Sequence, residues 1–288
     1  MVKPLYKYGK KRVITFSFDD GREQDEKLIP LLNKYSLKAT FNLNGGRCRN
    51  DRFAKVTENG KFWVGSSELR DLYHGHEIAS HSFLHKKINE MSDEELEEDT
   101  IKDIEALKKA FGVEIRGYAT PNGIRDKRMP AILKKHGICY ERFTCRVDTD
   151  TPFALPKDFL WWQPNPHFSY YAKDEGKKMI EDFFCTNEDL PCLYIWGHSY
   201  ELELLDCKGS ERWNGITDRY AYLEGLFENV AKRDDVWYAT NIEIYDYITN
   251  LRRTRYDDTY IDNPTDIPIY FEINGKVIAA PPHSRFGV

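Results

Sequence analysis

The 288-residue sequence lacks the patterns that mark membrane proteins, nucleic-acid-binding proteins and exported proteins. It has no run of about 18 apolar residues, so no segment is predicted to span a membrane. Residues 1–12 have no apolar signal-peptide core, which favours a cytoplasmic enzyme, although a chain trimmed of its leader would look the same. The net charge is −5 and no basic tract is present, which argues against nucleic acid as a partner.

Cysteines are few and scattered, and no two of them have the C-x-x-C spacing of a zinc or redox motif. Scattered thiols in a long chain are typical of reduced cytosolic residues. We therefore predict neither a disulfide framework nor a cysteine-ligated zinc site. The sequence also lacks internal repeats and low-complexity tracts. The cysteines are Cys48, Cys139, Cys145, Cys185, Cys192 and Cys207.

Apolar and aromatic residues are abundant, at 41% and 14% of the chain, and this supplies a substantial core. Aromatic side chains also suit sugar-binding clefts, but core packing is at least as common a use. Near-continuous apolar runs alternate with amphipathic helical patterns, which predicts a parallel sheet covered by helices on both sides. Because no break occurs at the midpoint, we expect an α/β barrel of about seven strands rather than two domains. The predicted strands are 13–18, 39–43, 77–80, 117–120, 138–143, 192–196 and 236–240.

The clearest predicted helix begins after Ser92, which forms a capping box with Glu95, and ends at Gly112. Residues 44–74 read as an irregular insertion that contains a short capped helix. Further helices are expected from near Glu23 and near 173–184, 216–232 and 241–250.

The end of the chain differs from the rest. Residues 267–280 alternate around Asn274-Gly275, which predicts a β-hairpin. We therefore expect a main domain over 1–250 and a small β-hairpin appendage over 251–288. The hairpin could pair with another subunit, and the sequence leaves the oligomeric state open.

Two adjacent carboxylates, Asp19 and Asp20, end the first long apolar strand. Neighbouring carboxylates repel, and burying either one is costly unless a positive charge compensates. The pair therefore indicates either a solvated turn or a bound cation.

A second informative stretch, GHEIASHSFLH, places His81 and His85 directly after the predicted strand 77–80. In a helical turn capped by Ser82, this spacing would put both imidazoles on one face. Two histidines and one carboxylate are a common catalytic zinc set, although two histidines four residues apart also occur by chance. His74 and His76 are interpreted as loop residues.

The segments SFDDG and HSFLH together resemble the polysaccharide deacetylases, also called carbohydrate esterase family 4 or the NodB-homology fold, over roughly residues 10–250. The resemblance implies a deformed (β/α) barrel that removes N-acetyl or O-acetyl groups from sugar polymers with one divalent metal. Asp20, His81 and His85 would be the ligands, and Asp19 the general base. Zinc suits this set, while cobalt, nickel, manganese and iron also fit.

The resemblance also assigns the remaining site residues. In TPNG, the backbone N–H of Asn122 would hold the oxyanion, and in LYIWGHSYE, His198 would protonate the leaving group. A lone histidine after a strand is otherwise more often structural. Tyr118, His167 and Trp196 complete the predicted substrate-side residues.

Two motifs depart from the family's pattern. Ala119 stands where the family has an arginine that orients the base, and Arg116 cannot be assumed to replace it. In the second motif, residues 146–168, Asp148 or Asp150 could supply the aspartate that tunes the catalytic histidine, but the tryptophan pair comes late. Three functions therefore stay open: a sugar deacetylase, a C–N hydrolase of a small non-sugar amide, and a non-catalytic carbohydrate-binding module.

Overall fold

The computed structural model describes residues 1–48, 66–144, 151–203, 210–213 and 215–288. Its centre is a seven-stranded sheet in the order β6-β5-β4-β3-β2-β7, with β8 also paired to β2, and all of these pairs are parallel. The predicted strands are thus confirmed. They are β2 (Arg12–Asp19), β3 (Ala39–Leu43), β4 (Glu77–Ser80), β5 (Gly117–Ala119), β6 (Tyr140–Arg142), β7 (Cys192–Gly197) and β8 (Val236–Tyr238).

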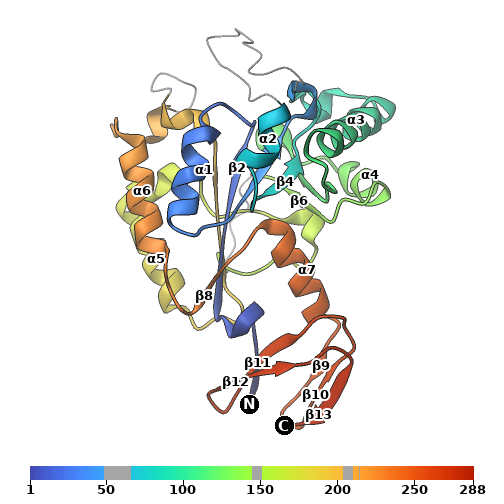
Figure 1. Cartoon of the computed structure of the whole chain (residues 1–288), viewed down its shortest axis with the longest axis vertical. Helices are drawn as coiled ribbons and strands as arrows, with labels where there is room; N and C mark the ends of the chain where they lie inside the picture. The colour runs from blue at the N-terminus through green and yellow to red at the C-terminus, as the bar shows by residue number, and fades with distance from the viewer. Residues whose placement is uncertain (49–65, 145–150, 204–209, 214) are drawn as a thin grey trace.

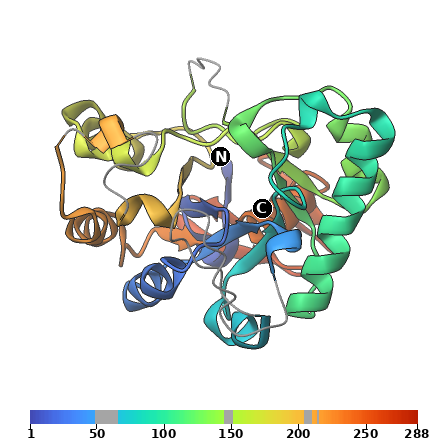
Figure 2. The same cartoon turned by 90° about the horizontal axis from the view of Figure 1, so that it is seen from above.

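The sheet curls because β2 has three partners. β7 pairs along one edge of β2, while β8 and β3 share the other edge, at its beginning and its end respectively. Residues 162–167 then run between β6 and β7, with isolated bridges from Trp162 to Arg142 and from His167 to Trp196. Seen from above (Figure 2), the strands lie in the middle of the domain and the helices lie around them. The predicted deformed barrel is confirmed.

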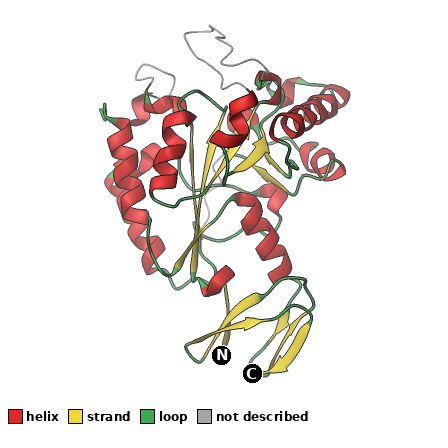
Figure 3. Cartoon of the chain, in the orientation of Figure 1, coloured by secondary structure: helices red, strands yellow, loops and turns green. Residues whose placement is uncertain are grey.

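Helices cover the outer face of the strands (Figures 1 and 3). The capping box of Ser92 and Glu95 and the left-handed Gly112 (φ 70°) bound α3 as predicted. The α-helices are α1 (Asp25–Lys34), α2 (Ser66–Leu72), α3 (Asp93–Phe111), α4 (Met129–Lys135), α5 (Asp174–Cys185), α6 (Arg219–Val230) and α7 (Asn241–Leu251). Short 3-10 helices are η1 (Lys7–Gly9), η2 (Gly45–Arg47), η3 (Ile88–Glu90), η4 (Pro121–Gly123), η5 (Phe159–Trp161), η6 (Phe168–Ala172), η7 (Ser199–Leu202) and η8 (Ser210–Trp213).

Alternation along β2 separates the core from the site. Phe16 and Phe18 face the helices, where Phe16 packs edge-on against Phe227 of α6. Ser17 and Asp19 therefore face the barrel interior. Among the helices of the described residues, none is both long and apolar enough to cross a membrane.

The chain ends in two small sheets. The predicted hairpin is confirmed as β11 (Ile269–Ile273) and β12 (Lys276–Ala280), with positive φ at both turn residues, Asn274 and Gly275. The N-terminal strand β1 (Val2–Leu5) pairs with β11, so both ends of the chain share this region (Figure 1). The second sheet has the order β13-β10-β9, from β13 (Ser284–Gly287), β10 (Tyr260–Asn263) and β9 (Arg255–Tyr256). A domain boundary at residue 250 stays a prediction.

Candidate metal centre and active site

The acidic pair that ends β2 is buried, with only 3% of Asp19 and 7% of Asp20 exposed. Asp20 has left-handed backbone (φ 80°), and its N–H donates to the carbonyl of Asn42 at 3.0 Å. A left-handed aspartate is uncommon, and this conformation ends the strand. A solvated turn is therefore excluded, and both carboxylates need partners inside the protein.

Asp20 faces two imidazoles. Its Oδ1 lies 3.9 Å from Nε2 of His81 and 3.6 Å from Nε2 of His85, and the ligand atoms of this group all lie within 4.8 Å of one another. This Oδ1 is buried and makes no hydrogen bond within the described residues, which is costly unless a cation binds there. One carboxylate and two imidazoles fit a divalent metal.

The tautomer of His81 also fits metal binding. Its Nδ1–H donates to the carbonyl of Ala119 at 2.7 Å, which leaves the lone pair of Nε2 directed toward Asp20. Burial lowers the pKa of His81 to about 4, so its imidazole is neutral near neutral pH. A neutral imidazole with a free lone pair is the form that binds a metal.

The prediction that His81 and His85 share a helical turn is wrong. Residues 81–87 form a loop in which Ser82 (φ 64°) and His85 (φ 57°) are left-handed, so Ser82 caps no helix there. The two imidazoles still meet, with ring centroids 4.9 Å apart. The four-residue spacing therefore correctly predicted that the two imidazoles lie close together, but it did not predict the loop conformation of the backbone between them.

Polar side chains from two other elements hold this loop. Asp103 of α3 accepts the N–H of His81 at 3.0 Å, and Asp99 accepts the N–H of Phe83 at 3.0 Å. Asn44 donates to the carbonyls of His81 and Ser82 at 2.6 and 2.9 Å. These bonds satisfy backbone groups that helical structure would otherwise pair, and so they stabilise the left-handed residues.

Asp19 is held as an ionised carboxylate. Its Oδ1 accepts from Nδ2 of Asn42 at 2.7 Å and from the buried guanidinium of Arg142. Burial alone would raise the pKa of Asp19, but the charge of Arg142 outweighs it and holds the pKa well below its usual range. A buried carboxylate kept in its basic form is suited to accept a proton.

Arg142 lies on β6, a strand that the sequence predicted without singling out this residue. Its Cα lies opposite that of Ala119 in the parallel β5–β6 register, so the guanidinium approaches from the neighbouring strand. Arg116 forms an ion pair with Asp246 at 2.6 Å instead. The strand β6 thus places an arginine beside Asp19, where Ala119 has none to offer.

His198 follows β7 and faces Asp19, with Nε2 3.9 Å from Oδ2. Its Nδ1 lies 3.1 Å from Oε1 of Glu201, whose Oε2 lies 3.1 Å from Nε2 of His167. Burial lowers the pKa of His198, but the hydrogen bond to Glu201 and the charges of Asp19 and Asp20 outweigh it and raise the pKa. A protonated imidazole beside the base is suited to donate a proton.

These residues carry the motifs of a known family. Residues 6–140 match the family model described as polysaccharide deacetylase. The prediction from SFDDG and HSFLH is thereby confirmed, and the match includes Asp19, Asp20, His81 and His85.

Relatives of the polysaccharide deacetylase segment extend the comparison. The uncharacterized protein YlxY of Bacillus subtilis (strain 168) is 30% identical over 124 residues, which are 42% of this chain and 35% of that protein. The chain thus spans about a third of the length of this relative.

Two solved structures share the fold. A protein from Mycobacterium smegmatis described as a polysaccharide deacetylase has a TM-score of 0.56 and 18% identity, over 87% of this chain and 94% of that one. Puue allantoinase also has a TM-score of 0.56, with 14% identity over 84% of this chain and 91% of that one. At these identities the likeness shows the fold alone, and it reaches well beyond residue 140.

The other predicted residues of the deacetylase site are placed differently. Trp196 on β7 packs against two histidines of the site, with its ring centroid 4.9 Å from His167 and 5.7 Å from His198. Asn122 follows β5 in left-handed backbone (φ 58°) and is exposed. Tyr118 is not part of the site, because alternation along β5 turns it outward into the core under α3. Asp148 and Asp150 lie outside the described residues.

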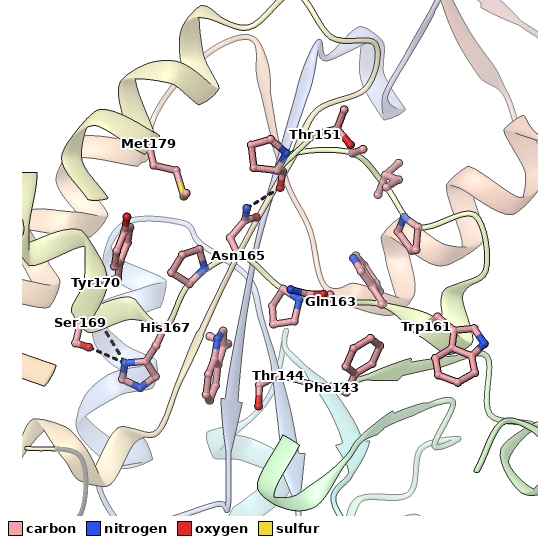
Figure 4. Close-up of a pocket in the computed structure, with 18 of the residues that line it drawn as sticks. Phe143, Thr144, Thr151, Trp161, Gln163, Asn165, His167, Ser169, Tyr170 and Met179 are labelled. Carbon is pink, nitrogen blue, oxygen red and sulfur yellow. Dashed lines mark hydrogen bonds between the residues drawn. The ribbon is translucent and has the colours of Figure 1, made fainter. Parts of the chain in front are cut away.

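A cavity of about 660 Å³ opens beside this site (Figure 4). His167 and Trp196 form one part of its wall, and Phe143, Trp161 and Tyr170 add aromatic faces. Ligand sites of this size combine aromatic walls with a few placed polar groups.

Glu201, like Arg142, is a residue of this candidate site that sequence reasoning missed. It is 1% exposed and contacts the predicted acid, yet WGHSYE was read only for its histidine. The i, i+3 spacing of His198 and Glu201 across a short turn was the available signal.

Proposed function

We propose that the chain is a metal-dependent hydrolase that removes acetyl groups from an N-acetylated or O-acetylated sugar. One observation carries the proposal. A metal-ligand set, an ionised carboxylate and an imidazole of raised pKa meet at the carboxyl ends of β2, β4 and β7, where α/β barrels place their sites.

In this proposal Asp20, His81 and His85 hold one divalent cation, with zinc the best match to two imidazoles and a carboxylate. Cobalt, nickel, manganese and iron also fit this donor set. When bound, such a cation polarises an acyl carbonyl and lowers the pKa of a water.

The remaining steps belong to the chain's own side chains. Asp19 accepts the proton of the attacking water, and Arg142 and Asn42 orient its carboxylate. His198 donates a proton from Nε2 to the departing nitrogen or oxygen. The backbone N–H of Asn122 is assigned to the oxyanion.

The cavity supports a sugar as substrate. Trp196, Trp161 and Tyr170 lie on its wall, and aromatic rings with polar edges suit the alternating polar and apolar faces of a pyranose. Cytoplasmic action stays a prediction of the sequence.

A small non-sugar amide is the second candidate. Its support is the site's departure from the family's pattern, in which Arg142 on β6 takes the place expected at Ala119. The fold shared with Puue allantoinase makes cyclic amides a reasonable set of test substrates. A non-catalytic binding module would have no use for an ionised, oriented Asp19.

The deciding experiment measures acetate release from N- and O-acetylated oligosaccharides with and without added Zn²⁺ or Co²⁺, beside ring opening of cyclic amides. Asp19→Asn is the control, and metal content is measured for both proteins. Metal-dependent acetate release that is lost in Asp19→Asn supports the deacetylase. Activity on cyclic amides alone supports the second candidate, and a metal-loaded protein inactive on both panels contradicts both.

A further inference from the structure

A second group of one carboxylate and two imidazoles lies beside the metal centre. Glu201 stands between His167 and His198, with one carboxylate oxygen 3.1 Å from each ring. Nothing in the proposed chemistry yet uses His167, although it is buried, and neither its Nε2 nor Oε2 of Glu201, 3.1 Å away, makes a hydrogen bond within the described residues. A buried polar atom in this position needs a physical explanation.

The tautomer of His167 follows from its other nitrogen. Nδ1 receives the backbone N–H of Ser169 at 3.3 Å and lies 2.8 Å from the Ser169 hydroxyl (Figure 4). A backbone N–H can only donate, so Nδ1 is the acceptor and the proton of the neutral ring is on Nε2. That proton faces Oε2 of Glu201.

His198 completes the arrangement. Oε1 of Glu201 receives the Nδ1–H of His198, and this leaves Nε2 as the nitrogen that faces Asp19. We propose that Glu201 and His167 are positioning residues that select the tautomer and ring orientation of His198, so that Nε2 delivers the proton to the leaving group. The inference rests on the proposed function and adds two residues to it.

The surrounding structure holds Glu201 in place. It lies in η7, where the i, i+3 geometry of a 3-10 turn brings its side chain over that of His198. Its backbone carbonyl accepts from the buried Arg219 of α6. His167 lies on the segment that joins β6 to β7, where it bridges to Trp196. A group fixed from three elements can orient a ring without moving during the reaction.

A metal ion between the same three side chains is the competing explanation. Ligation through Nε2 of His167 needs a lone pair there, which would move the ring proton to Nδ1. A protonated Nδ1 would then point its hydrogen at the backbone N–H of Ser169, and these two donors would repel each other. The geometry therefore favours two imidazole N–H groups facing Glu201, from His198 and His167, over a second metal.

The test separates proton donation from the rest of catalysis by changing the leaving group. A p-nitrophenyl ester loses a phenolate that departs without a proton, whereas an N-acetyl sugar loses an amine that needs one. Glu201→Gln should lower kcat on an N-acetylated chito-oligosaccharide about 100-fold and kcat on p-nitrophenyl acetate less than about threefold. Glu175→Gln, an exposed residue of α5, is the matched control and should change neither rate.

His167 is tested by two variants of different character. His167→Ala should lower kcat on the N-acetyl substrate about tenfold, because Oε2 of Glu201 loses the imidazole N–H that lies 3.1 Å away. His167→Gln offers an amide N–H to Oε2 and should recover most of that loss. Equal losses on both substrates, or no recovery in His167→Gln, would overturn the inference.

A measurement independent of activity keeps the inference separate from the proposed function. In ¹⁵N-histidine NMR spectra of the zinc-loaded protein at high pH, His167 should carry its proton on Nε2 and His198 on Nδ1. In Glu201→Gln the His198 signal should change toward the other tautomer. The opposite tautomer in wild type, or a second equivalent of zinc that is lost in His167→Ala, would overturn the inference even if no substrate is hydrolysed.

Discussion

Two clusters of the same composition, Asp20 with His81 and His85 and Glu201 with His167 and His198, lie side by side with opposite characters. In the first, the far nitrogen of His81 donates to the carbonyl of Ala119. In the second, the far nitrogen of His167 receives an N–H from Ser169. The partner behind each ring thus decides whether the front nitrogen offers a lone pair or a proton.

The carboxylates differ in one respect. Oδ1 of Asp20 and Oε2 of Glu201 are each buried without a hydrogen bond within the described residues, but Oε1 of Glu201 accepts from His198. Two histidines and an acid are therefore not enough to identify a metal site, and the surrounding hydrogen bonds have to be counted as well.

The largest predicted effect is on metal binding. His81→Ala should abolish both bound metal and acetate release, because it removes a ligand from a three-residue set. Metal content measured by mass spectrometry after zinc loading is the readout.

His167→Ala is the matched substitution in the second cluster and should keep one full equivalent of metal. A His81→Ala protein that retains its metal, or a His167→Ala protein that loses it, would reverse the assignment of the two clusters.

The next effect concerns Asp19, the proposed base. Asp19→Asn should lower kcat about 10²- to 10⁴-fold while the metal stays bound, since the amide cannot accept the proton of water. Acetate release and metal content are measured on the same sample. Full activity in the metal-loaded Asp19→Asn protein would exclude Asp19 as the base.

Acid titration should separate the clusters in metal-free protein. Burial lowers the pKa of His81 from 6.5 to about 4, so between these values the unfolded chain binds more protons than the native one. Stability should therefore fall as the pH drops through this window, by about 3 kcal/mol in total. For His198, whose pKa is raised, the stabilisation is present below its ordinary pKa and is lost as the pH rises through the folded value.

Urea unfolding of EDTA-treated protein over this pH range measures both slopes. His81→Asn should flatten the acid side, and His198→Asn should flatten the side near neutral pH. If His81→Asn leaves the acid slope unchanged, His81 is not the buried neutral ring that the structure indicates.

The smallest effect is on the tautomer-setting contact. Ser169→Ala removes the hydroxyl beside Nδ1 of His167 but keeps the backbone N–H, so kcat should fall only about threefold. Steady-state kinetics on an N-acetylated sugar is the measurement. A loss as large as that in His167→Ala would mean that the hydroxyl, and not the backbone, sets the tautomer.

Sequence patterns were reliable where burial and spacing decide the structure. The apolar runs predicted the sheet, and the position of Asp19, Asp20 and His198 after strands predicted their meeting at one edge. Arg142 was missed because its strand reads as ordinary core, and only the register with Ala119 shows that its side chain enters the barrel.

Local backbone was harder to predict. The spacing of His81 and His85 suits a helix, but bonds from Asp99, Asp103 and Asn44 make a loop of left-handed residues more stable. These partners are distant in sequence, so no local pattern contains them. Tyr118 was predicted to face the substrate, but side chains along β5 alternate between the two faces of the sheet. Its neighbour Ala119 faces the barrel interior, so Tyr118 faces the core.

The pairing of β1 with β11 has a consequence for how the protein folds. Val2 pairs with Ile273, which lies more than 250 residues further along the chain. All strands of the central sheet lie between these two partners, so the barrel can be complete while β1 is still unpaired. Because contacts between residues so far apart form slowly, we expect β1 to join its sheet after the barrel has formed.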